Sequence, residues 1–272
     1  MPDHLGDQLS PIPALAAAAA ATTTIRIGSF VFANDYRNPV MLAKEIASLD
    51  VLSEGRVEFG IGAGWSMSDY RQLGIPYDAP KTRVDRMEES LRLIKRLWTE
   101  EKVTHSGSHY QVRDVTLTPR PVQRPHPPIM VGGGGPRMLA IAARESQIVA
   151  LLAQVNARGR PIIRTGSDAS IAARLSRLRA AIGPRYDRLE LNVIVFDAQL
   201  TDARQSVIDS IAARFKAAAT AVARTPFVLY GSKSSIIDQL LERRARMGIS
   251  YVVIPGGAMR AFAPVVAELH GK

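Results

Sequence analysis

Two glycine-rich segments contain residue types that could bind a ligand directly. The first, VEFGIGAGW at 57–65, alternates like a strand and then reaches Gly62, Ala63 and Gly64. The second, at 129–136, is a short apolar run followed by Gly132, Gly133, Gly134 and Gly135, with Pro136 opening a helix. Glycine at a strand end lets another group approach the main chain, and bare amides at a helix N-terminus favour phosphate. Both segments indicate a flat or phosphate-bearing ligand at the carboxyl ends of parallel strands.

The five histidines are suited to proton transfer rather than to metal binding. The ordinary pKa of an imidazole lies near working pH, so it can give or take a proton. His105 and His109 are four residues apart, but Ser106-Gly107-Ser108 between them argues against one helix face. The chain has no Cys, which excludes disulfides and thiolate ligands. We therefore expect no metal site.

The composition predicts one compact α/β domain. The chain has 272 residues, of which 46% are hydrophobic and 22% charged, and a single α/β barrel commonly has about this length. No run of about 18 apolar residues occurs, so no membrane span is expected. The absence of Cys fits the cytoplasm, which is the predicted location.

The basic residues are spread along the chain, although its formal net charge is +10. Nucleic-acid binding would require them on one face or in one tail, so we expect no nucleic-acid partner. They recur between apolar positions in three predicted helices, which indicates solvated outer faces. These residues are Arg92, Lys95 and Arg96; Arg174, Arg177 and Arg179; and Arg243, Arg244 and Arg246. A positive field would still help to recruit an acidic coenzyme.

The elements that must position these residues alternate between strands and helices. Strands are predicted at 25–32, 57–62, 129–132, 147–152, 190–196 and 250–254. Among the helices, one is capped by Asn38 before Pro39, and Thr82-x-x-Asp85 resembles a capping box. The alternation predicts a parallel sheet with right-handed crossovers in a single domain, 1–272. Only the proline-rich segment 102–128 departs from this rhythm, as an excursion.

The chain resembles the luciferase-like monooxygenase and coenzyme F-420-dependent oxidoreductase family. Six segments carry the resemblance in order: Pro2-Asp3-His4, IRIGSFVF at 25–32, the helix at 38–56, 57–65, IMVGGGGP at 129–136, and the pattern at 227–255. The resemblance implies a TIM (β/α)8 barrel. The six predicted strands would be barrel strands three to eight. We therefore expect an N-terminally truncated barrel that lacks the first strand, first helix and second strand. Either the chain was cut short by the choice of start site, or it begins here and must close its barrel otherwise.

The resemblance also assigns roles near the coenzyme ring. In similar deazaflavin enzymes, an Asp-His pair matching Asp3 and His4 lies at the ring, and the histidine assists hydride transfer. Phe30 and Val31 match a non-proline cis peptide that forms a bulge behind the ring. The alternatives are a mobile N-terminus at His4 and a plain trans strand at 30–31.

Further roles follow along the two glycine-rich segments. Ala63 and Gly64 would lie beside the ring, unless their small size serves packing alone. Gly132, Gly133, Gly134, Gly135 and Pro136 would bind the coenzyme phosphate, unless the glycine run is only a flexible turn. Trp65 and Ser68 would face the substrate, with Trp65 as an apolar wall. Relatives that oxidise sugar phosphates have an acidic residue where Trp65 stands, which argues against that substrate class.

Three functions remain open from the sequence. The first is hydride transfer between coenzyme F-420 and a small organic substrate, with His4 exchanging the proton. The second is an FMN-dependent monooxygenase that uses oxygen and receives reduced flavin from a partner reductase. The third is a non-catalytic truncated barrel, or a subunit completed by forming a homodimer.

Overall fold

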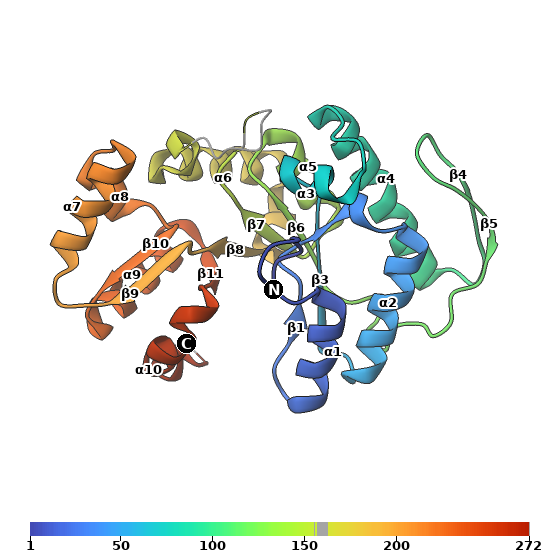
Figure 1. Cartoon of the computed structure of the whole chain (residues 1–272), viewed down its shortest axis with the longest axis horizontal. Coiled ribbons are helices and arrows are strands. Elements are labelled where there is room, and N and C mark those ends of the chain that lie inside the picture. The colour runs from blue at the N-terminus through green and yellow to red at the C-terminus, as the bar shows by residue number, and fades with distance from the viewer. Residues whose placement is uncertain (155, 157–162, 272) are drawn as a thin grey trace. The chain divides into compact units, whose positions relative to one another are not determined.

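A computed structural model describes residues 1–154, 156 and 163–271 (Figure 1). These residues form two compact units. The first contains Met1–Val149 and Asn156, and the second contains Ala150–Gln154 and residues 163–271. Within the described residues, no helix is both long and apolar enough to cross a membrane.

The first unit is built on a parallel sheet centred on β3 (Val57–Gly62). β3 pairs with β1 (Ile27–Gly28) and β2 (Phe32–Ala33) on one side and with β6 (Ile129–Gly133) on the other. All six residues of β3 are buried, which is typical of a strand covered on both faces. Because β3 and β6 are parallel neighbours, the two glycine-rich segments end at the same edge of the sheet.

Glycines in β3 make room for the neighbouring strand. The peptide bond between Phe30 and Val31 is cis, as the family resemblance predicts. It separates β1 from β2, so the single strand expected at 25–32 was wrong: two short strands stand there. A Cβ on Gly60 would collide with the carbonyl oxygen of Ser29, and one on Gly62 would lie 2.8 Å from Val31 Cγ2. The close approach at these two positions therefore comes from the chain itself.

Helices cover this sheet. Those of the first unit are α1 (Pro11–Ala21), α2 (Pro39–Leu52), α3 (Met67–Leu73), α4 (Pro80–Thr99) and α5 (Pro136–Glu145), with the short 3-10 helix η1 (Asn34–Tyr36) after β2. Asn38 caps α2 as predicted, since its side chain accepts a hydrogen bond from Val40 N at 2.9 Å. The capping box expected at Thr82 is absent, because α4 already begins at Pro80. Asp85 instead pairs with Lys81 at 2.8 Å.

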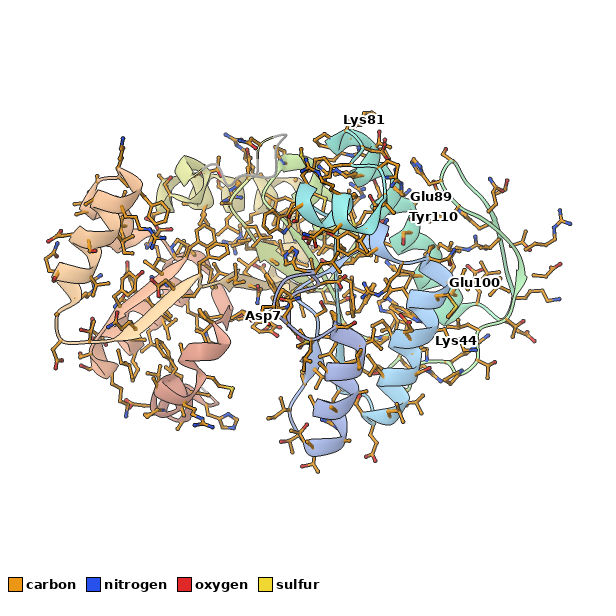
Figure 2. The ribbon with its side chains drawn as sticks, viewed as in Figure 1. Asp7, Lys44, Lys81, Glu89, Glu100 and Tyr110 are labelled. Atoms are coloured by element: carbon orange, nitrogen blue, oxygen red, sulfur yellow. The ribbon has the colours of Figure 1, made fainter. Side chains whose placement is uncertain are left out.

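The excursion at 102–128 contains a short antiparallel hairpin, formed by β4 (Val103–Ser106) and β5 (Gln111–Val115). Glu89 of α4 fastens its turn. The Glu89 carboxylate accepts hydrogen bonds from the main-chain amides of His109 and Tyr110, at 3.1 and 2.9 Å. His105 Nε2 lies 3.1 Å from the same carboxylate. Glu89 and Tyr110 are labelled in Figure 2.

The second unit has two parallel strand pairs. β8 (Glu190–Ile194) pairs with β11 (Ile249–Val253), and β9 (Asp197–Leu200) pairs with β10 (Val228–Gly231). The strand predicted at 190–196 thus ends two residues early, and the β9–β10 pair was not predicted. The division between the units falls inside β7 (Ile148–Leu151).

The helices of the second unit bury two arginines that the sequence placed in solvent. Its helical elements are η2 (Ile163–Gly166), α6 (Asp168–Ile182), η3 (Gly183–Arg188), α7 (Arg204–Phe215), α8 (Ala219–Arg224), α9 (Lys233–Met247), η4 (Gly256–Ala258) and α10 (Met259–Leu269). Arg174 and Arg243 are only 8% and 3% exposed. Arg243 donates to the main-chain oxygens of residues 225, 226 and 228. The expectation of solvated faces was therefore wrong for these two residues.

Candidate active site

The first four residues are fixed against the sheet of the first unit. Met1 O accepts hydrogen bonds from Phe30 N at 2.7 Å and from Ser29 Oγ at 3.0 Å. Asp3 is buried, and its carboxylate takes a bidentate pair of hydrogen bonds from Arg37, at 2.6 and 3.0 Å. Ala33 N donates to the same carboxylate at 3.0 Å. These contacts tie the residues just before His4 to the sheet and to Arg37.

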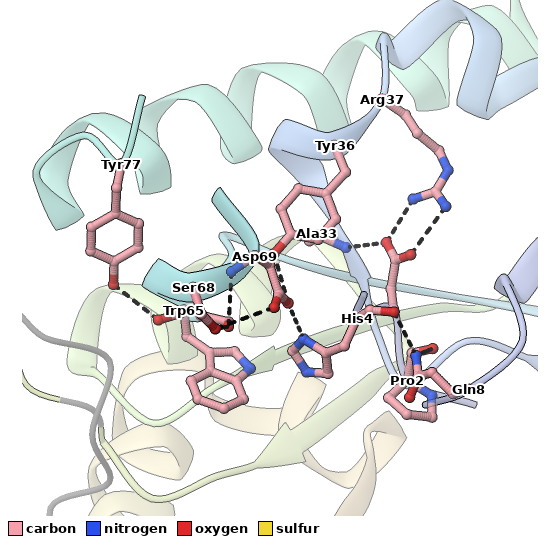
Figure 3. A network of polar contacts seen from close by, with 12 residues as sticks. Pro2, His4, Gln8, Ala33, Tyr36, Arg37, Trp65, Ser68, Asp69 and Tyr77 are labelled. Atoms are coloured by element: carbon pink, nitrogen blue, oxygen red, sulfur yellow. Dashed lines mark hydrogen bonds and ion pairs between the residues drawn. The ribbon is translucent and has the colours of Figure 1, made fainter. Parts of the chain in front are cut away.

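His4 is oriented by a buried carboxylate on α3. Its Nδ1 lies 2.6 Å from Asp69 Oδ2, and Tyr36 Oη donates to the same oxygen at 3.2 Å (Figure 3). The side chain of Asp69 is 8% exposed and that of His4 is 31% exposed. Burial favours the neutral carboxylic acid, but the hydrogen bonds from His4, Ser66 and Tyr36 prevail and hold the pKa of Asp69 below its ordinary value. Asp69 therefore acts as an acceptor at neutral pH.

Trp65 forms a partly open wall beside His4. The two ring centroids are 5.2 Å apart and the rings are nearly perpendicular. Trp65 is 47% exposed, so an apolar molecule could lie against it. Ser68 is exposed as well, and its Oγ lies 3.0 Å from Ser66 Oγ and 3.4 Å from Asp69 Oδ1. Of the two residues predicted to face the substrate, Trp65 thus contacts the His4 ring and Ser68 contacts Asp69.

Contacts with Tyr70 and Arg83 hold the turn that follows β3. Gly64 has a φ of +72°, and a Cβ there would collide with Tyr70 Oη. The Ala63 carbonyl accepts a hydrogen bond from Tyr70 Oη at 3.3 Å, and the Gly64 carbonyl accepts one from Arg83 Nη1. Packing against Tyr70 therefore accounts for a glycine at position 64.

The second glycine-rich loop ends in an open helix N-terminus. Gly135 is the N-cap of α5, no side chain within residues 1–154, 156 and 163–271 caps the helix, and its first turn has no acidic residue. A Cβ on Gly135 would meet no described atom within 4 Å, whereas one on Gly133 would collide with Met138. Arg137, the next residue after Pro136, pairs with Asp85 and Glu88 of α4. The main-chain amides, more than Arg137, are thus the donors that an anion would meet.

The structure adds Asp69, Tyr36 and Arg37 to the residues named from the sequence. Asp69 had a local signal, because Ser66-x-x-Asp69 is a helix-capping pattern and Ser66 Oγ accepts from Asp69 N at 3.4 Å. Its contact with His4 spans 65 positions and had no local signal.

A separate pocket of about 350 Å³ lies between α4, the hairpin turn and α5. Its lining residues are Asp85, Glu88, Glu89, Arg92, His105, Ser108, His109 and Arg137. The arginines of this pocket are engaged in ion pairs, since Glu88 binds Arg92 at 2.6 Å and Arg137 at 3.3 Å. The pocket includes none of the predicted site residues. Across the described residues, no group of three His, Asp or Glu side chains is arranged to hold a metal ion.

Residues 1–250 match the family model of the luciferase-like monooxygenases, and the chain belongs to this family. The F420-dependent tetrahydromethanopterin reductase of Methanopyrus kandleri has a similar fold, with a TM-score of 0.73 at 17% identity. That comparison covers 94% of this chain and 84% of the reductase. The predicted fold class, an α/β fold of the luciferase-like barrel type, is therefore confirmed.

Curated relatives match about half of the chain. The FMNH(2)-dependent dimethylsulfone monooxygenase of Pseudomonas putida is 32% identical over 130 residues, which are 48% of this chain and 36% of that enzyme. The F420-dependent glucose-6-phosphate dehydrogenase of Kineococcus radiotolerans is 37% identical over 127 residues, which are 46% of this chain and 37% of that enzyme. The matched segment thus spans little more than a third of each relative.

Proposed function

We propose that this chain is an oxidoreductase that uses coenzyme F-420 with a small organic substrate, and that His4 exchanges the proton accompanying hydride transfer. One observation supports this most directly. His4 is fixed through Nδ1 by Asp69, while its Nε2 has no hydrogen-bond partner within residues 1–154, 156 and 163–271. A histidine with one nitrogen anchored and the other open is arranged for proton exchange.

The residues present are suited to an anionic coenzyme. Bound F-420 would supply the hydride-carrying ring carbon. The N-terminus of α5, which follows a glycine-rich loop and has no acidic residue in its first turn, would bind the coenzyme phosphate. Ala63 and Gly64 would lie beside the ring, with Phe30 and Val31 behind it. Asp3 would act through position, because its carboxylate is occupied by Arg37 and Ala33.

The substrate would lie against Trp65 and near Ser68. An exposed indole favours an apolar surface, and no acidic side chain occupies position 65. We therefore propose a substrate other than a sugar phosphate, although one relative is named as a glucose-6-phosphate dehydrogenase.

An FMN-dependent monooxygenase is the second candidate. The Pseudomonas putida relative, named as FMNH(2)-dependent, supports it. The same loop would hold the FMN phosphate, and a partner reductase would supply reduced flavin. In this case oxygen would be a substrate, and His4 would exchange a proton during oxygen transfer.

Titration of the purified chain with oxidised F-420, and separately with FMN, tests the proposal by coenzyme fluorescence. We expect micromolar binding of F-420 and weaker binding of FMN. Gly135→Ala should weaken F-420 binding about tenfold, because its new methyl group points into space that no described residue occupies and that the phosphate would fill.

The matched control is Gly257→Ala, since a Cβ there also meets no atom of the described residues within 4 Å. It should leave binding unchanged. Preferential binding of FMN would favour the monooxygenase, and binding of neither coenzyme would reject both candidates for this chain.

A further inference from the structure

We propose that Asp69 is a positioning residue that fixes His4 as the Nδ1–H tautomer, so that Nε2 is the atom that exchanges protons. This inference rests on the proposed function for its consequence, but the hydrogen-bond arrangement that carries it belongs to the protein alone.

The Asp69 carboxylate is a focus of hydrogen-bond donors. Oδ2 accepts from His4 Nδ1 at 2.6 Å and from Tyr36 Oη at 3.2 Å, and Oδ1 accepts from Ser68 Oγ at 3.4 Å (Figure 3). The Asp69 main-chain amide is bound by Ser66 Oγ, which caps α3. Contacts on both the main chain and the side chain therefore fix the carboxylate, and a fixed carboxylate fixes the imidazole.

The tautomer follows from the identity of the acceptor. An ionised carboxylate has no hydrogen to donate, so the hydrogen in a 2.6 Å contact must belong to His4 Nδ1. A neutral imidazole has one N–H, so Nε2 then has a free lone pair and accepts a proton. When His4 is protonated, Nε2–H is the proton that can leave. One atom therefore serves both directions of proton exchange.

Separate contacts hold the main chain and the ring of His4. Arg37 and Ala33 hold Asp3, the residue before it, and Gln8 Nε2 donates to the His4 carbonyl at 3.1 Å. These contacts fix the main chain but do not by themselves restrain the ring. The Asp69 hydrogen bond and the edge contact with Trp65 fix the ring.

Nitrogen-15 NMR of the histidine-labelled chain measures the tautomer directly. His4→Gln assigns the His4 signals. At a pH where imidazoles are neutral, we expect the His4 shifts of an Nδ1–H tautomer in the wild type. In Asp69→Asn the amide can donate to Nδ1 as well as accept from it, so the shifts should move toward the Nε2–H tautomer.

Matched variants separate positioning from general stability. Asp187→Asn makes the same chemical change in an exposed pair with Arg179 and should leave the His4 shifts unchanged. Tyr36→Phe removes a donor to Asp69 but keeps the carboxylate, so the Nδ1–H shifts should remain. Asp69→Glu restores a carboxylate and should recover part of the wild-type signal.

The kinetic readout distinguishes this inference from the proposed function. If F-420 binds, Asp69→Asn should lower kcat about a hundredfold while the coenzyme Kd changes less than about threefold, because a misoriented proton acceptor impairs the reaction more than binding. An Nε2–H tautomer in the wild type, or unchanged shifts in Asp69→Asn, would overturn the inference even if F-420 binds. Failure of F-420 binding with an Nδ1–H tautomer would reject the proposed function and leave the positioning role supported.

Discussion

His4 owes its position to residues that are distant in the sequence. His4 and Trp65 could be named from the sequence because a family pattern surrounds each of them. The contacts of Asp69 with His4 and of Arg37 with Asp3 could not be predicted, because they depend on how β1, β2 and β3 align. Sequence patterns thus indicated the side chain proposed to exchange the proton but missed the residues that orient it.

Replacement of His4 tests its role at the scale of one side chain. We expect His4→Gln to lower the rate of F-420 reduction or oxidation by about 10²- to 10⁴-fold, the usual contribution of a positioned proton-transfer group. The rate should be measured with a small organic substrate identified by screening. His270→Gln, at an exposed position, is the control and should react at the wild-type rate. Equal rates for His4→Gln and wild type would remove His4 from the reaction.

Gly64 and Gly74 form a natural pair for measuring crowding at the turn after β3. Both have a left-handed φ, +72° and +67°, but a Cβ would collide with Tyr70 only at position 64. Gly74→Ala should cost about 1 kcal/mol of unfolding free energy from backbone conformation alone. Gly64→Ala should cost about 3 kcal/mol, because the collision adds to the same backbone term. Urea unfolding measures both losses of unfolding free energy. Equal losses would show that the turn accommodates the added methyl group at no energetic cost.

At the scale of elements, sequence patterns correctly predicted features that depend only on neighbouring residues. Asn38 caps α2 as expected, because an N-cap needs only the neighbouring amides. The pattern at 25–32 predicted one strand, and the cis peptide at Phe30–Val31 divides it in two. Arg243 looked solvated because its sequence neighbours are charged, yet main-chain oxygens of 225–228 bind its guanidinium in the interior. Tertiary contacts decided both of these outcomes.

The hairpin at 103–115 depends on Glu89, and this dependence should vary with pH. Burial favours the protonated carboxyl, but hydrogen bonds from His105 and from the amides of Tyr110 and His109 hold the pKa of Glu89 below its ordinary value. The charged form thus stabilises the folded state above the pKa of an unfolded glutamate, about 4.3. This stabilisation is lost as the pH falls through the lower folded-state pKa.

Glu89→Gln should therefore cost about 2 kcal/mol at pH 7 and progressively less below about pH 4. Urea unfolding at pH 7, 5 and 3.5 measures the difference. Glu101→Gln, at an exposed position beyond α4, should show little cost at any of these pH values. A cost for Glu89→Gln that does not change with pH would mean that the charge of Glu89 contributes nothing.

At the scale of the whole molecule, the division between the two units falls within one strand. Ile148 and Val149 of β7 belong to the first unit, and the next two residues belong to the second. If one half of a strand unfolded, the hydrogen bonds between its other half and the neighbouring strands would be disturbed. We therefore propose that residues 1–272 unfold as one domain.

Arg243→Leu tests this proposal. It leaves three main-chain oxygens without their donor and should lower the unfolding free energy by about 3 kcal/mol. Hydrogen exchange should show equal loss of protection in the most protected peptides of both units. Arg244→Leu, at an exposed neighbouring position, should change little. Loss of protection confined to the second unit would show two independently unfolding domains.

The two tryptophans lie in contrasting environments, and this gives the protein a built-in optical reporter. Trp98 is 2% exposed and its indole N–H donates to the Ala43 carbonyl, whereas Trp65 is 47% exposed and touches the His4 ring. A water-soluble quencher such as iodide should reach only Trp65. In a Trp98→Phe variant the remaining emission would come from the indole beside His4. Such a variant would reveal a molecule arriving at Trp65 without any label and before its chemical identity is known.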